Sequence, residues 1–243
     1  MRYFVELAYL GSDFHGSQTQ PNGITVQEVL EEAFATILRT PVALTFAGRT
    51  DAGVHAERMF AHFDLAANLP ANLVSRLNSL LPPAVAVYTI RPVQPDAHAR
   101  FSALSRTYEY RILTGKDPFR YGRATRVAEG LDFEQMNLAA AKMLGKQDFA
   151  SFCRVHTDVK TTFCTVTRAE WRDSVFTITA DRFLRNMVRA VVGTLFEVGR
   201  GKMTVADFEN IIAQRNRCKA GQSAPAEGLY LVDIQYDKNI YND

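Results

Sequence analysis

A short segment in the first quarter of the chain places one carboxylate between two glycines. It reads Gly48-Arg49-Thr50-Asp51-Ala52-Gly53-Val54-His55-Ala56. Glycine lets a backbone turn sharply and approach a ligand closely, and loops on a rigid sheet are where catalytic groups concentrate. Asp51 could act as a nucleophile or a base, as carboxylates do at sugar carbons. The pattern alone favours a simpler interpretation, in which Thr50 and Asp51 build an Asx-type turn.

Aromatic and basic residues are interleaved in a second segment, Arg106-Thr107-Tyr108-Glu109-Tyr110-Arg111. Strand alternation puts Tyr108 and Tyr110 on one face, with Arg106 and Arg111 near the ends. Such a surface suits stacking on bases and neutralising phosphates. Two tyrosines facing a core, with arginines at the surface, explain the pattern equally well.

A third segment, Arg182-Phe183-Leu184-Arg185-Asn186-Met187-Val188-Arg189, opens an apolar stripe that runs to Phe196. The stripe predicts a helix that includes Leu184, with Arg185 and Arg189 one turn apart on a flanking face. An arginine at a helix start near a carboxylate would keep that acid ionised. Plain surface arginines are the interpretation that the spacing alone favours.

The basic residues are clustered, although the net formal charge is only +2. Residues 100–126 hold seven basic residues against two acidic ones, and residues 182–202 hold five against one. Two basic blocks on a nearly neutral chain indicate a basic face of the kind that binds nucleic acid.

Several other function classes find no motif in the sequence. No P-loop, GxGxxG or GxSxG occurs, so nucleotide hydrolysis, hydride transfer and serine-hydrolase chemistry have no support. The five histidines show no metal-ligand spacing, and the three cysteines form no CxxC pair. We expect a cytoplasmic chain with no membrane partner, because no signal-peptide shape and no apolar run of roughly 18 residues is present.

Hydrophobic periodicity predicts alternating strands and helices. Strands are expected over 2–9, 42–47, 54–65, 85–90, 104–113, 162–171, 174–181 and 229–236. Helices are expected over 26–37, 70–81, 133–144, 184–196 and 204–213. The first helix follows a capping box, and a hairpin turn is expected at Arg172-Asp173. This set predicts an α+β fold with a mostly antiparallel sheet shared by two halves, 1–103 and 104–243.

The chain resembles the tRNA pseudouridine synthase A family. Segment 48–55 looks like the active-site motif of that family, and further matches follow in family order along almost the whole chain. These matches are Gly11-Ser12-Asp13-Phe14-His15-Gly16, Thr25-Val26-Gln27-Glu28, Arg106-Thr107-Tyr108, Asp148-Phe149-Ala150-Ser151-Phe152-Cys153, Phe183-Leu184-Arg185-Asn186-Met187-Val188-Arg189 and Ala224-Pro225-Ala226-Glu227-Gly228-Leu229-Tyr230-Leu231. Six motifs in order over this length are highly specific.

The resemblance implies an isomerase that converts uridine to pseudouridine at positions 38, 39 and 40 of the tRNA anticodon stem-loop. It implies no cofactor and no metal, and a homodimer in which each tRNA lies across both subunits. The implied fold has two ferredoxin-like (RNP-like) halves sharing a central sheet, with a catalytic cleft between them. Residues 1–103 would carry the catalytic aspartate loop, and residues 104–243 would complete the sheet, the cleft and the dimer interface.

Three residues match the catalytic residues of the family. The resemblance makes Asp51 the catalytic aspartate and nucleophile, with attack at C1′, addition at C6 and removal of the 2′ proton all open. Tyr108 matches the tyrosine whose ring stacks on the extruded uracil and whose hydroxyl helps remove the C5 proton. Arg189 matches the arginine that pairs with the aspartate and keeps it anionic.

Other matches concern substrate binding. Arg49 is expected to reach into the stem and hold the target nucleotide out of the stack. Leu229 matches a leucine that packs at the uracil pocket, and Arg106 is expected to bind phosphate. One departure stands out, because Ser17 replaces a tryptophan that the family usually carries after the first loop. The loss of that aromatic surface affects a packing or RNA contact rather than the chemistry.

Two other functions compete with the synthase hypothesis. A non-catalytic RNA-binding module would use the same basic and aromatic surface, but an acid such as Asp51 is costly in a phosphate-binding cleft unless it acts. A sugar-acting hydrolase would use Asp51 as its nucleophile, but the sequence offers no obvious second carboxylate.

Overall fold

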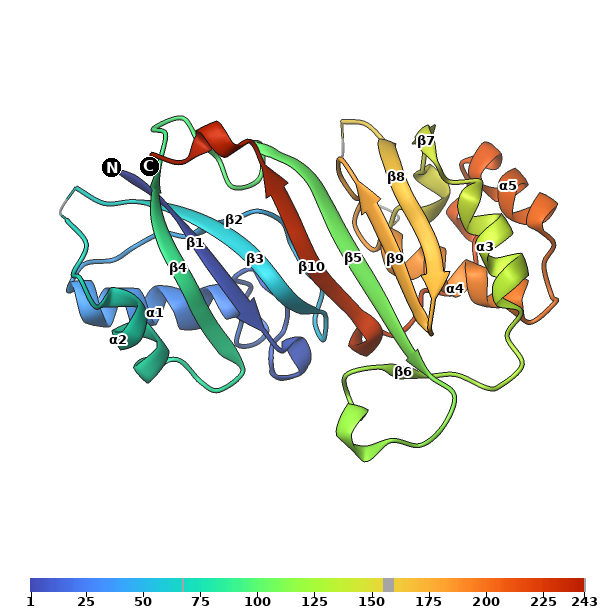
Figure 1. The fold of residues 1–243 in the computed structure, drawn as a ribbon, viewed down its shortest axis with the longest axis horizontal. Coiled ribbons are helices and arrows are strands. Elements are labelled where there is room, and N and C mark those ends of the chain that lie inside the picture. The colour runs from blue at the N-terminus through green and yellow to red at the C-terminus, as the bar shows by residue number, and fades with distance from the viewer. Residues whose placement is uncertain (67, 155–159, 243) are drawn as a thin grey trace. The chain divides into compact units, whose positions relative to one another are not determined.

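A computed structural model describes residues 1–66, 68–154 and 160–242 of the chain. His156, one of the five histidines considered above, lies outside the described residues. The chain divides into two compact units, the first formed by Met1–Leu104 with Leu231–Asp243 and the second by Ser105–Tyr230. Figure 1 shows the helices and strands of each unit.

The first unit combines an antiparallel sheet with two helices. Its elements are β1 (Arg2–Tyr9), α1 (Val26–Leu38), β2 (Thr45–Phe46), β3 (His55–Asp64), α2 (Leu73–Leu80), β4 (Val85–Val93) and most of β10 (Leu229–Tyr236). The strands lie in the order β4-β1-β3-β10, and β2 also pairs with β3. Helices α1 and α2 lie against this sheet (Figure 1). In the sheet, β1 lies between β3 and β4, and this spatial order is that of a ferredoxin-like unit.

The capping box predicted before α1 is confirmed. The Thr25 hydroxyl accepts the N–H of Glu28 at 3.3 Å, and the Glu28 carboxylate accepts the N–H of Thr25 at 2.8 Å. These bonds satisfy two donors that the first turn of a helix leaves without partners. The apolar stripe of α1 is buried, and Phe34 packs on Phe63 of β3 with ring centroids 5.1 Å apart.

The strand predicted over 42–47 is reduced to β2, and the reason lies in α1. The N–H of Leu44 donates to the Glu31 carboxylate at 2.8 Å, and the Leu44 carbonyl accepts from the Gln27 amide at 3.1 Å. Side chains of α1 therefore take the backbone groups that a strand would use for pairing. Val42 and Leu44 are still buried, as a strand pattern would require.

Strand β4 is longer than predicted. The expectation of 85–90 ended before Pro92, but Pro92 pairs opposite Tyr3 and Val93 opposite Arg2. Proline is tolerated where its missing N–H faces away from a neighbouring strand, as at a sheet edge.

The second unit also combines an antiparallel sheet with helices. Its elements are most of β5 (Ala103–Leu113), β6 (Thr125–Arg126), α3 (Phe133–Ala141), β7 (Gly145–Asp148), β8 (Phe163–Arg172), β9 (Val175–Ala180), α4 (Met187–Gly199) and α5 (Val205–Gln214). The strand order is β5-β9-β8-β7, and short β6 pairs with β5 in parallel. The sequence patterns did not predict β6 or β7, which are short and mostly polar.

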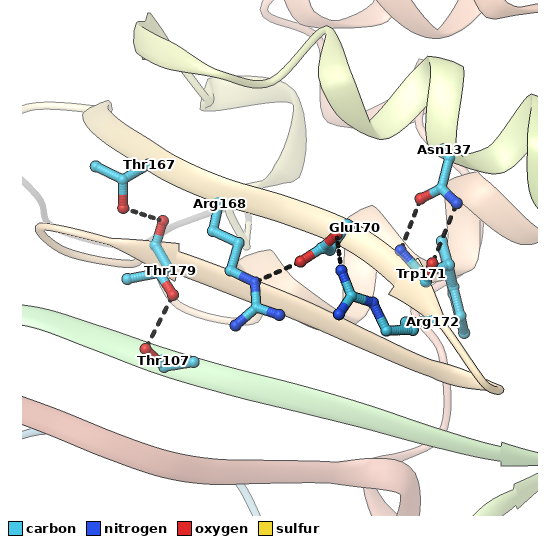
Figure 2. A network of polar contacts seen from close by, with 8 residues as sticks. All are labelled: Thr107, Asn137, Thr167, Arg168, Glu170, Trp171, Arg172 and Thr179. Carbon is cyan, nitrogen blue, oxygen red and sulfur yellow. Dashed lines mark hydrogen bonds and ion pairs between the residues drawn. The ribbon is translucent and has the colours of Figure 1, made fainter.

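Polar contacts join the strands and α3 of the second unit (Figure 2). The hydroxyls of Thr107 and Thr179 lie 2.9 Å apart between β5 and β9. Asn137 of α3 bonds both backbone groups of Trp171, accepting its N–H at 2.7 Å and donating to its carbonyl at 3.1 Å. These bonds fix the helix on β8 where the ladder with β9 ends.

Two predicted boundaries change in this unit because of backbone conformation. The hairpin turns at Asp173-Ser174, one residue later than predicted, and both residues have positive φ, 48° and 66°. Two such residues form the turn that matches the twist of a hairpin. Helix α4 begins at Met187 and excludes Leu184, because Asn186 is left-handed with φ 65°. Asparagine tolerates this conformation better than most residues.

The predicted α+β class with mostly antiparallel pairing is confirmed. No helix in the described ranges is long and apolar enough to cross a membrane.

Candidate active site

Asp51 lies in a tight loop between β2 and β3 of the first unit. The N–H of Val54 donates to the Asp51 carbonyl at 3.1 Å, and Gly53 has φ 79°. A φ in this range favours glycine, so the second glycine of the motif closes the turn. Asp51 is half-buried, whereas Thr50 before it is buried and Arg49 is exposed.

Ser17 forms hydrogen bonds with both backbone groups of Thr50, the residue that precedes Asp51. The Ser17 hydroxyl accepts the N–H of Thr50 at 2.9 Å, and the Ser17 N–H donates to the Thr50 carbonyl at 3.2 Å. Ser17 is fully buried. The Thr50 hydroxyl lies 2.8 Å from the Tyr9 hydroxyl of β1. The loop is therefore anchored to the sheet one residue before the candidate catalytic carboxylate.

Two glycines of the first loop allow this close approach. A Cβ on Gly16, which has φ 95°, would lie 2.8 Å from the Thr50 carbonyl oxygen, and one on Gly11 would lie 2.0 Å from that of Val54. The Gly11 N–H donates to Nδ1 of buried His55 at 3.0 Å. His55 is therefore buried and hydrogen-bonded to the first loop.

In the second unit, β5 carries Arg106 and Tyr108. Tyr108 is half-buried, and its ring meets that of Phe183 edge-on with centroids 5.1 Å apart. Arg106 donates to the Asp181 carbonyl at 2.9 Å. Tyr110, two residues along the strand, is fully buried. The core interpretation therefore holds for Tyr110, whereas Tyr108 is only partly covered.

The buried tyrosine Tyr110 has a structural role. Its hydroxyl lies 2.7 Å from the Thr125 hydroxyl and donates to the Pro225 carbonyl at 2.9 Å. Burial raises the pKa of Tyr110 above its ordinary value. Arg111, at the end of the same motif, pairs with Glu109 at 2.7 Å and lies over the Tyr230 ring at 4.0 Å.

Arg189 lies in the first turn of α4 and is half-buried. Its Nε donates to the Ala224 carbonyl at 2.7 Å, and the Ala224 N–H donates to the Arg189 carbonyl at 2.9 Å. The prediction that Arg185 and Arg189 lie one turn apart on one face of the helix is wrong. Arg185 precedes the left-handed residue Asn186 and is not in the helix.

Segment 221–225 passes so close to α4 that a glycine is required there. A Cβ on Gly193 would lie 1.7 Å from the Gln222 carbonyl oxygen. This approach brings Ala224 to Arg189 and Ser223 to the amide of Asn186, at 2.6 Å. The packing thereby fixes the base of the Arg189 side chain.

Leu229 begins β10 and is buried, and the preceding glycine Gly228 is also tightly packed. Of the six residues named from the sequence, the structure joins Arg49 with Asp51 in one loop and Arg106 with Tyr108 on one strand. Sequence reasoning missed Ser17 as a partner of the loop. Its only signal was the departure from the family pattern.

No group of three or more His, Cys, Asp or Glu side chains in the described part of the chain could hold a metal ion.

Comparison with known proteins identifies the family. A family model described as tRNA pseudouridine synthase matches residues 139–237. A protein of Bacteroides thetaiotaomicron named tRNA pseudouridine synthase A is 53% identical over 250 residues, covering 100% of this chain and 93% of that protein. A protein of the same name from Bacillus licheniformis is 39% identical, covering 98% of this chain and 100% of that protein.

These matches extend over both units and confirm the resemblance that the motifs indicate. They also confirm the prediction that this protein is an isomerase, because the relatives are named tRNA pseudouridine synthase A and the matches cover nearly their whole length. The chain therefore belongs to the tRNA pseudouridine synthase A family.

Proposed function

We propose that this protein converts uridine to pseudouridine at positions 38, 39 and 40 of the tRNA anticodon stem-loop, with Asp51 as the catalytic nucleophile. Formation of pseudouridine in tRNA follows from membership of the family. The observation that supports Asp51 as the nucleophile is the anchoring of its loop at Thr50 by the buried Ser17. A carboxylate on a fixed loop is positioned before the substrate arrives, as efficient catalysis requires.

The reaction exchanges one bond for another within a single nucleotide. The C1′–N1 bond breaks, the uracil turns while it is held, and a bond forms between C5 and C1′. The proton of C5 is lost and N1 gains one, so that product and substrate have the same composition. The reaction therefore needs no redox or group-transfer cofactor.

Each further residue has a proposed role in that sequence. The Tyr108 ring stacks on the extruded uracil, and its hydroxyl helps remove the C5 proton. Arg189 pairs with Asp51 and keeps it anionic. Leu229 packs at the uracil, Arg49 holds the target nucleotide out of the stack, and Arg106 binds a phosphate. The partial exposure of Tyr108 and Arg189 supports the roles of these two residues at the substrate.

We also propose that the protein is a homodimer, which binds each tRNA across both subunits and acts in the cytoplasm. Light scattering at micromolar concentration then gives about twice the chain mass of 27.2 kDa. A mass of one chain, with full activity on tRNA, contradicts the dimer proposal.

The target positions are tested with four tRNA transcripts that carry tritium at C5 of every uridine. Three keep uridine at only one of positions 38, 39 and 40, with base pairs preserved, and the fourth has none there. We expect tritium release from the first three and none from the fourth. Release from the fourth at the same rate contradicts the positions and leaves the isomerase activity intact.

A second labelled substrate separates removal of the 2′ proton by Asp51 from nucleophilic attack at C1′ or C6. Deuterium at C2′ of the target uridine slows the reaction and is lost to solvent if the carboxylate removes the 2′ proton. Retention of deuterium, with no isotope effect, leaves the proposed nucleophilic attack.

A further inference from the structure

A cavity of about 380 Å³ lies in the first unit beside the base of the Asp51 loop. It is lined by the beginning of that loop, by β2, by the first loop of the chain and by the turn after β4. The side chains that matter here are Gln18, Gln27, Arg49, His98, Arg100 and Phe101. A volume of this size is in the range of sites for small organic groups such as one nucleotide.

The turn that carries Arg100 and Phe101 is held by its own hydrogen bonds. Nδ1 of His98 accepts the N–H groups of Arg100 at 3.1 Å and Phe101 at 3.4 Å. The Ser102 hydroxyl accepts the His98 N–H at 3.0 Å, and the Ser102 N–H donates to the His98 carbonyl at 2.9 Å. The backbone of Phe101 is therefore fixed, although its side chain is 75% exposed.

The exposed ring of Phe101 is backed by two histidine rings. The centroids of Phe101 and His98 are 4.4 Å apart, and those of His98 and buried His62 are 4.5 Å apart. The guanidinium of Arg100 lies 5.6 Å from the centre of the Phe101 ring. Proteins that bind single-stranded nucleic acid stack its bases on exposed aromatic rings of this kind, held by a fixed backbone and placed next to an arginine.

The charge around the cavity is positive. Arg49 and Arg100 are both exposed, and among the described residues that line the cavity none is acidic. The guanidinium of Arg100 suits a phosphate. The amide of exposed Gln18 offers both a donor and an acceptor for a base edge. One nucleotide brings all three chemistries together, whereas a free phosphate would leave Phe101 unused.

We propose that this cavity binds one unpaired nucleotide of the tRNA substrate, with its base stacked on Phe101 and its phosphate held by Arg100. The inference rests on the proposed function, because it assigns to the substrate a second contact outside the target uridine.

A tryptophan at position 101 tests the stacking directly. The chain has a single tryptophan, Trp171, which is buried in the second unit and gives a constant background. In Phe101→Trp, an unmodified tRNA transcript should quench the new fluorescence on binding, because a stacked base quenches indole emission. The matched control is Tyr88→Trp, an exposed aromatic position on β4 that does not line the cavity.

Quenching in Phe101→Trp but not in Tyr88→Trp supports the subsite. Equal quenching in both variants, or none in either when tRNA is bound, overturns it. Uridine monophosphate at millimolar concentration forms a third arm. Quenching by the free nucleotide without quenching by tRNA overturns the assignment to an RNA nucleotide.

An affinity measurement adds a second readout that does not depend on turnover. Phe101→Leu removes the aromatic face and keeps an apolar side chain, so the Kd for tRNA should rise about 5- to 100-fold. Phe101→Tyr should keep the wild-type Kd. If both variants bind equally well, stacking at this position is excluded. Failure of the wild type to release C5 tritium would instead contradict the proposed function, and the fluorescence result would still decide the subsite.

Discussion

Ser17 and Thr50 are joined by two hydrogen bonds, in which the Ser17 hydroxyl accepts the Thr50 N–H at 2.9 Å and the Ser17 N–H donates to the Thr50 carbonyl at 3.2 Å. The pair connects the first loop of the chain to the residue that precedes Asp51. Because Ser17 is fully buried, water cannot replace its hydroxyl without a change in packing. The position of Asp51 therefore depends on a side chain outside the catalytic motif.

We predict that Ser17→Ala lowers kcat by about 10- to 100-fold, because small displacements of a reacting group are costly. The Kd for tRNA should stay within about twofold of wild type, since the Ser17 side chain is buried and is not accessible to RNA. The free energy of unfolding should fall by roughly 1–3 kcal/mol, because the Thr50 N–H loses its partner. The control is Ser12→Ala, an exposed serine in the same first loop. Equal kcat values in the two variants contradict a positioning role.

Gly193→Ala should disturb the support of Arg189. The added methyl would lie 1.7 Å from the Gln222 carbonyl oxygen, so segment 221–225 must move and carry Ala224 away from Arg189. Overpacking of this kind costs about 1–3 kcal/mol of stability. Thermal unfolding and tritium release check both effects. Gly115→Ala is the matched control, because a Cβ there meets no atom within 4 Å, and an equal loss in the two variants contradicts the packing explanation.

His62 predicts how stability depends on pH. Burial, followed by the nearby charges of His98 and Arg2, lowers the pKa of His62 from 6.5 to about 4. The unfolded chain therefore binds more protons than the folded chain between these values. The stability that neutral His62 provides is complete above pH 6.5 and falls as the pH drops toward 4.

The measurement is Tm as a function of pH for the wild type and for His62→Gln. We expect a steeper fall in Tm between pH 6.5 and 4 for the wild type, because the variant has no group to titrate at this position. Parallel curves for the two proteins would show that His62 does not titrate in this window.

Substitutions of Tyr108 and Tyr110, the two tyrosines of β5, should affect different measured properties. Tyr110→Phe leaves the Pro225 carbonyl and the Thr125 hydroxyl without their partner, so the free energy of unfolding should fall by about 1–3 kcal/mol. Tyr108→Phe keeps the edge contact with Phe183 and should slow tritium release. Urea unfolding and the rate of release distinguish the two. The reverse pattern would exchange the roles assigned to these residues.

Local patterns predicted the elements that depend on local interactions. The capping box at Thr25 and the bounds of β10 are as expected, since both follow from residues close together in the sequence. The strand at 42–47 failed because Glu31 and Gln27 of α1, 13 and 17 positions before Leu44, bind its backbone. The start of α4 failed because Asn186 adopts a left-handed conformation that the apolar stripe does not encode.

The candidate site shows the same division. The motif with Asp51 was visible in the sequence because its glycines and carboxylate are contiguous. Ser17 was visible only as an unusual residue, and its partnership with Thr50 depends on a contact across 33 positions. Likewise, no spacing in the sequence connects Phe101 with Gln18 and Arg49 around one cavity.

The central claim is that Asp51 carries out the isomerisation. The most direct measurement is tritium release from tRNA labelled at uridine C5, with the wild type, Asp51→Asn and the control Asp96→Asn, an exposed acid of the same unit. We predict release by the wild type and Asp96→Asn, none by Asp51→Asn, and an unchanged Kd for tRNA in all three. Release by Asp51→Asn at the wild-type rate would contradict the claim.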